Sequence, residues 1–127
     1  MNKNSVIYKD IKNKEDITEL VLCFYNKIRE DELLSPIFNA VIKDWDSHLE
    51  KMISFWFTLL LYTRTYKGDP LPVHLPLKIE KTHFDRWINL FETTIDERFK
   101  GEIATNAKKR AWSIARIMKA VKQIPEE

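Results

Sequence analysis

The three histidines of this chain are its strongest candidates for functional residues, because a neutral imidazole can supply an axial nitrogen to a metal. His74 lies in the middle of residues 70–80, where three prolines prevent a long helix although the residues between them are apolar. Such a stretch must pack against other parts of the protein, so we expect His74 to be held in place as a metal ligand. A hydrogen-bonded core or surface histidine is the alternative.

His48 is predicted to lie on an amphipathic helix, one residue before Leu49 and one turn before Met52. From there its imidazole can face a pocket lined by apolar side chains, or it can lie at the edge of a partly solvated helix. The spacing alone leaves both positions open. His83 stands where a helix is expected to begin, and we predict that it lies at the surface or at the rim of a site.

Tyr25 and Trp87 carry polar atoms on helical stripes that are otherwise apolar. The Tyr25 hydroxyl and the Trp87 indole N–H each need a hydrogen-bond partner when they are buried. A ligand in a pocket is one such partner, and ordinary core packing is the alternative for both residues.

The elements that would position these residues are helices. Apolar residues from Ile17 to Ile28 recur in steps of three and one, which places them on one helical face, and Asn13 is expected to cap the start of this helix. A turn is expected at residues 68–70, and no alternating run is long enough for a confident strand. The pattern therefore predicts an all-α fold.

The starts of the later helices are predicted from residues whose side chains accept hydrogen bonds from free backbone N–H groups, or whose backbone suits the first turn. The expected residues are Ser35 (followed by Pro36), Asp44 or Asp46, and Thr82 (in a capping box with Asp85), with Gly101 separating the last helix.

Composition limits the function classes. The 127 residues suit a single domain over residues 1–127, with about twelve N-terminal and a few C-terminal residues loosely ordered. A net charge of +2 gives no reason to expect nucleic acid, and the longest apolar run, residues 55–62, is too short for a membrane span. The chain has one cysteine, no evident signal peptide, no phosphate-binding glycine loop and no serine nucleophile motif. A cytoplasmic domain is expected.

Four segments, taken in order, carry a family resemblance that covers roughly residues 15–118. They are "FYNKIREDELLSPIFNAVI" (residues 24–42), "WDSHLEKMISFW" (45–56), "YKGDPLPVHLPL" (66–77) and "HFDRWINLFETT" (83–94). The chain resembles the group III truncated haemoglobins of bacteria in these segments. It also lacks the Gly-Gly pairs that groups I and II of that family carry.

The resemblance implies a globin-like fold, a short two-over-two helical sandwich around one haem b (iron protoporphyrin IX). His74 resembles the proximal histidine that binds the iron, and Phe38 resembles the phenylalanine that packs on the haem face. The distal ligand-binding residues would be Tyr25, His48 and Trp87. The other implied haem contacts are Met52, Trp56, Tyr66 and Phe84, with Arg64, Tyr66 and His83 as candidates for the propionates.

The resemblance further implies reversible, high-affinity binding of O₂, CO, NO or similar diatomic ligands, because hydrogen-bond donors stabilise a ligand that carries partial negative charge. A haem enzyme with peroxidase-like or NO dioxygenase activity, served by an unidentified reductase, is the alternative. A haem-free interaction or sensor module is a third hypothesis. The presence of His74 together with Tyr25, His48 and Trp87 argues against that third hypothesis.

Overall fold

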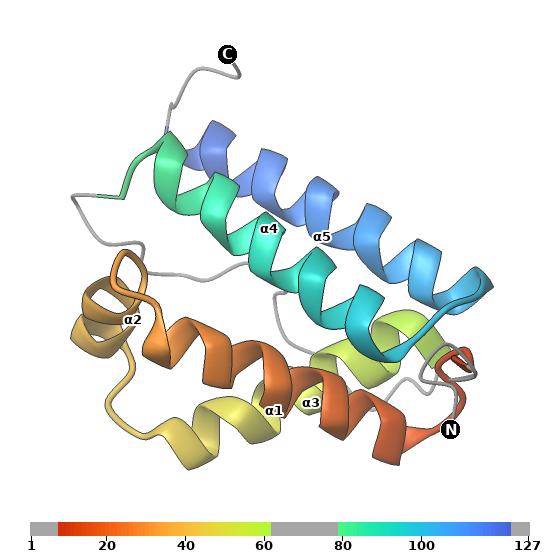
Figure 1. The fold of residues 1–127 in the computed structure, drawn as a ribbon. Helices are drawn as coiled ribbons and strands as arrows, with labels where there is room; N and C mark the ends of the chain where they lie inside the picture. Colours follow the sequence, from red (N-terminus) through yellow and green to blue (C-terminus); the bar gives the residue numbers. More distant parts are fainter. Residues whose placement is uncertain (1–7, 62–78, 123–127) are drawn as a thin grey trace, which may run out of the picture.

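The computed structural model describes residues 8–61 and 79–122. This part of the chain forms five α-helices and no strand (Figure 1). The helices are α1 (Lys14–Glu30), α2 (Ser35–Val41), α3 (Trp45–Leu61), α4 (Lys81–Arg98) and α5 (Glu102–Val121). The all-α prediction is confirmed.

The helices form two packed pairs. Helix α1 packs against α3 and α4, and α4 runs beside α5 along most of its length (Figure 1). The pair α1/α3 therefore lies against the pair α4/α5, which is the two-over-two arrangement. Residues Ile17, Leu20, Phe24 and Ile28 of α1 are fully buried, so the periodic stripe faces the core as the sequence predicts.

Two of the predicted helix starts are confirmed. The Asn13 side-chain oxygen accepts a hydrogen bond from the Asp16 N–H at 2.9 Å, at the start of α1. The Asp44 carboxylate accepts one from the Ser47 N–H at 3.2 Å, so Asp44 rather than Asp46 caps α3. Both residues satisfy N–H groups that lack a partner within the helix.

The other two predicted starts are wrong by one or two residues. Ser35 lies inside α2, and the carboxylate of Asp31 accepts the N–H groups just before it, at 3.0 and 3.1 Å. Helix α4 begins before Thr82, because the His83 ring Nδ1 accepts the Glu80 N–H at 2.8 Å and stabilises an earlier start. Side chains of Asp31 and His83 therefore accept the backbone N–H groups at these two helix starts, where Ser35 and Thr82 were predicted as caps.

The segment before α1 is fastened to the start of α5. The two carboxylate oxygens of Asp10 accept the Ile103 and Ala104 N–H groups, each at 2.8 Å. Gly101 has a φ of 149°, and a Cβ at this position would collide with the Asp10 side chain. Ile11, the next residue along the chain, is buried in the core.

Candidate functional site

Three rings from two helices meet at one end of the α1/α3 contact. The ring centroids of Tyr25 and His48 are 5.2 Å apart, with the ring planes at 83°. Trp45 lies 6.0 Å from Tyr25 and 5.9 Å from His48, again edge-on. Phe38 of α2 is 6.2 Å from Tyr25. The structure thus brings together three of the predicted site residues, Tyr25, His48 and Phe38.

Tyr25 is buried because it belongs to the stripe of α1 that faces the core. Its side chain is only 5% exposed, and burial raises the pKa of its hydroxyl above the ordinary value. The group therefore remains a neutral O–H donor at any physiological pH. The hydrogen bonds within the described part of the chain do not include this hydroxyl.

His48 lies half-buried on α3, with its Nε2 atom fully enclosed. No described residue provides a hydrogen-bond partner for Nε2. Burial, and then the positive charge of Lys51, lowers the pKa of His48 below its ordinary value. The imidazole is therefore neutral near pH 7. A buried nitrogen without a partner is rare in proteins and marks a place where a ligand or water would be bound.

Trp87 and Trp56 belong to a neighbouring group of rings. Trp87 lies 5.6 Å from Phe24 and 6.0 Å from Phe91, on α4. Trp56 is stacked on Phe91 at 4.9 Å and is almost completely buried. Among the described residues, the ring contacts of these tryptophans are with phenylalanines and not with Tyr25 or His48. Their predicted place on the distal side of a cofactor stays a prediction.

The remaining predicted residues divide into those that the structure describes and those that it does not. Phe84 is buried near the start of α4, and Met52 is partly buried on α3 against the core. His83 is used in the first turn of α4. The predicted iron ligand and two of the propionate candidates, His74, Tyr66 and Arg64, lie outside the described residues.

Trp45 is the site residue that the sequence analysis did not single out. Its indole Nε1 donates a hydrogen bond to the side-chain oxygen of Asn39 at 3.0 Å, and the guanidinium of Arg29 lies 4.6 Å from the ring centre. Its spacing of three residues before His48 places both rings on one helical face, which is the signal that could have found it.

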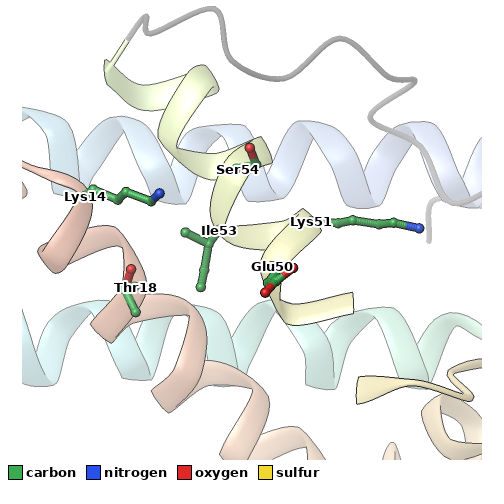
Figure 2. A pocket seen from close by; sticks show the side chains of 6 residues that line it. All are labelled: Lys14, Thr18, Glu50, Lys51, Ile53 and Ser54. Atoms are coloured by element: carbon green, nitrogen blue, oxygen red, sulfur yellow. The ribbon is translucent and has the colours of Figure 1, made fainter. Parts of the chain in front are cut away.

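A separate hollow lies between α1 and α3, where the side chains of Lys14 and Ile53 project toward each other's helices (Figure 2). None of the residues predicted for the site lines it. The six lining residues are Lys14, Thr18, Glu50, Lys51, Ile53 and Ser54.

Two negative findings apply to the described residues alone. No three side chains of His, Cys, Asp or Glu there gather into a group that could hold a metal ion. No helix among them has the length and apolar character needed to cross a membrane.

Comparison with known proteins identifies the family. The model of the bacterial-like globin family matches residues 6–123. A group 3 truncated haemoglobin of Campylobacter jejuni subsp. jejuni serotype O:2 is 36% identical over 108 residues, which are 81% of this chain and 85% of that protein. The crystal structure of a group III truncated haemoglobin from Campylobacter jejuni matches with a TM-score of 0.80 and 32% identity, over 91% of this chain and 94% of that one. These matches confirm the predicted resemblance and the globin-like fold, and the chain belongs to the bacterial-like globin family.

Proposed function

We propose that this chain is a haem b protein that binds O₂, CO, NO or similar diatomic gases on an iron ligated by His74. Family membership supports a haem-binding role. The observation that carries the finer proposal is the buried, unpartnered Nε2 of His48 beside the buried hydroxyl of Tyr25. A buried nitrogen that gives up hydration without gaining a partner is costly unless a ligand uses it, and the Tyr25 hydroxyl lies beside it.

The residues present fit the demands of haem. Haem is a large apolar disc whose porphyrin supplies four nitrogen ligands to the iron. The protein must therefore supply one axial nitrogen and apolar side chains that line the site. When bound, it supplies an iron centre at which a diatomic gas can bind. We assign Phe38, Met52, Trp56, Tyr66 and Phe84 to the walls, with His74 as the axial ligand. Phe38 already packs beside Tyr25 at the described end of the site.

Tyr25 acts in this proposal as the principal hydrogen-bond donor. Its raised pKa keeps the O–H neutral, and its burial leaves no water to compete for the proton. A hydrogen bond from this hydroxyl to a ligand oxygen with partial negative charge contributes about 1–3 kcal/mol. That range corresponds to roughly one to two decades in the dissociation rate.

His48 acts as a second polar group that also controls access. The neutral imidazole has one N–H and one free nitrogen, so Nε2 can donate to a ligand or accept from a water, depending on the tautomer. Its half-buried ring lies at the edge of the site, where a rotation would connect the site with solvent. Trp87 is assigned as a third donor.

A spectrum of the purified, haem-loaded protein tests the proposal. We expect a Soret band, a stable ferrous-oxy spectrum and a five-coordinate, histidine-ligated ferrous form. His74→Ala should abolish that ferrous form and weaken haem retention, and added imidazole should restore it. His83→Ala serves as the matched control and should leave the ligation unchanged.

Three results would contradict the proposal. One is failure of the wild-type protein to take up haem. Another is loss of histidine ligation in His83→Ala or His48→Ala while His74→Ala retains it. The third is sustained consumption of hydrogen peroxide or NO by the reduced protein, which would favour the alternative of a haem enzyme supplied by a reductase.

A further inference from the structure

Trp45 is the first residue of α3, one helical turn before His48. Its ring stands edge-on to the rings of both Tyr25 and His48, at interplanar angles of 66° and 88°. The three rings form a closed triangle with sides of 5.2, 5.9 and 6.0 Å. A rotation of the His48 ring toward Trp45 would therefore meet the indole.

The position of Trp45 is fixed by contacts with two other helices. Its indole N–H donates to the Asn39 Oδ1 atom of α2 at 3.0 Å, and the Asn39 Nδ2 atom donates in turn to the Ser35 Oγ atom at 3.1 Å. The guanidinium of Arg29, in the last turn of α1, lies over the indole at 4.6 Å in a cation–π contact. Three helices thus determine where one tryptophan ring stands.

A hydrogen bond fixes the Trp45 indole, whereas the buried Nε2 atom of His48 beside it has no hydrogen-bond partner among the described residues. The inner nitrogen of His48 has no partner among the described residues, so no hydrogen bond there holds the ring in its inward orientation. Packing must hold the ring there, and among the described residues Trp45 and Tyr25 are the two rings in contact with it. Tyr25 lies on the core side, which leaves Trp45 as the neighbour that can yield.

We propose that Trp45 is a positioning residue, which Asn39 and Arg29 hold so that it keeps His48 turned inward and closes this edge of the site to water. The claim about the His48 ring stands on the contacts alone, and its consequence for gas binding rests on the proposed function. Breaking the Trp45–Asn39 bond would let the indole move, and His48 would gain contact with water.

The charges near His48 determine the sign of the expected change. Burial of the imidazole, and then the positive charge of Lys51 on α3, opposes its protonation and lowers the pKa of His48. Tyr25 on α1 is neutral, and the guanidinium of Arg29 on α1 lies over the ring of Trp45. Admission of water removes part of the burial effect and leaves Lys51 in place. The pKa of His48 should therefore rise toward its ordinary value when Trp45 is released.

Two substitutions break the same hydrogen bond from opposite ends. Trp45→Phe keeps an aromatic ring but removes the indole N–H, and Asn39→Leu keeps a similar volume but removes the acceptor. Trp112→Phe is the matched control, because the Trp112 indole N–H also bonds a side-chain oxygen, that of Glu92 at 2.8 Å, on the α4/α5 pair. Circular dichroism establishes that each variant is folded.

Two measurements are made on the haem-loaded, CO-bound ferrous protein. An NMR titration gives the pKa of the His48 imidazole, whose signal is assigned by its absence from His48→Gln. Hydrogen–deuterium exchange is followed at the C2 position of the same imidazole. Both Trp45→Phe and Asn39→Leu should raise the His48 pKa by about half a unit or more and speed the C2 exchange. The double variant should match either single one, because all three lack the same bond. O₂ dissociation should accelerate by about three- to tenfold.

The proposal is overturned if His48 titrates and exchanges as in the wild-type protein in both folded variants, or if Trp112→Phe changes these values equally. Additive effects in the double variant would also contradict it, because the two substitutions would then act independently. A wild-type protein that binds no haem would contradict the proposed function instead, and the same His48 titration, made on the haem-free protein and its variants, would then decide the role of Trp45.

Discussion

Phe24 and Tyr25 are neighbours in α1, yet they belong to two different kinds of aromatic cluster. The Phe24 cluster consists of Phe24, Trp56, Trp87 and Phe91, with centroid distances of 4.9 to 6.0 Å. The Tyr25 cluster consists of Tyr25, Phe38, Trp45 and His48, at 5.2 to 6.2 Å. The two clusters are about equally tight, and Phe24 and Tyr25 themselves are 5.1 Å apart.

The clusters differ in their polar atoms. Two members of the Phe24 cluster are phenylalanines, and Phe24, Trp56 and Phe91 are almost completely buried. Three of the four rings in the Tyr25 cluster carry a polar atom, and of these atoms the indole N–H of Trp45 is bonded to Asn39 while His48 Nε2 has no partner among the described residues. Apolar contacts stabilise the fold, whereas unpartnered buried polar groups cost stability. The comparison therefore separates the core from the site.

The largest effect that this comparison predicts is on stability. Phe91→Ala removes the ring that contacts Phe24, Trp56 and Trp87, and it should lower the free energy of unfolding by about 3–5 kcal/mol. Urea denaturation measures the change, with the exposed Trp112→Phe as a control expected within about 0.5 kcal/mol of wild type. A loss below about 1 kcal/mol for Phe91→Ala would mean that the Phe24 cluster is not the structural core.

Tyr25→Phe should have the opposite profile. It removes one buried hydroxyl that bonds no described residue, so the free energy of unfolding should change by less than about 1 kcal/mol. The O₂ dissociation rate should rise by about tenfold or more, which corresponds to roughly 1.4 kcal/mol. Denaturation and stopped-flow ligand replacement on one preparation give both numbers. A large loss of stability with an unchanged O₂ dissociation rate would show that Tyr25 is a structural core residue and not a ligand donor.

His48 should make stability depend on pH. Its pKa is lowered in the folded protein, so the unfolded chain binds the proton more readily, and the free energy of unfolding should fall as the pH drops below the ordinary value of 6.5. His48→Leu should remove this part of the dependence, and Lys51→Met should weaken it. His48→Leu should also change the O₂ association rate more than the dissociation rate. An unchanged slope between pH 7 and 5 in His48→Leu would contradict a buried neutral imidazole.

Trp87 lies between the two interpretations and should show the smallest effect. It belongs to the Phe24 cluster, yet its indole N–H bonds no described residue and is assigned to the ligand. Trp87→Phe should shift the Fe–CO and Fe–O₂ stretching frequencies while helix content stays constant. Resonance Raman spectra test this, and unshifted frequencies together with lowered stability would make Trp87 a core residue.

Much of the fold could be predicted from the sequence, because the stripe of α1 and the caps Asn13 and Asp44 depend on residues close in the chain. The errors at Ser35 and Thr82 arose where a second side chain competed for the same backbone groups. Asp31 reaches forward to the N–H groups before α2, and His83 reaches back to Glu80. Neither contact follows from helical periodicity.

The site was predictable only in part. The burial of Tyr25 followed from its place on an apolar stripe, and the structure agrees. The orientation of His48 did not follow, because it depends on Trp45 and, through Trp45, on Asn39 of another helix. The spacing of residues along α3 cannot predict a contact that a side chain of α2 provides. The role of His74 was predicted from the sequence and lies outside the described residues.

The most direct test of the division between core and site is a side-by-side measurement of O₂ dissociation from Tyr25→Phe and His48→Leu, at one temperature and pH. If the buried Tyr25 hydroxyl is the principal donor and His48 chiefly controls access, Tyr25→Phe should accelerate dissociation by about tenfold or more and His48→Leu by clearly less. Faster dissociation from His48→Leu than from Tyr25→Phe would contradict this account, because the histidine would then be the principal donor.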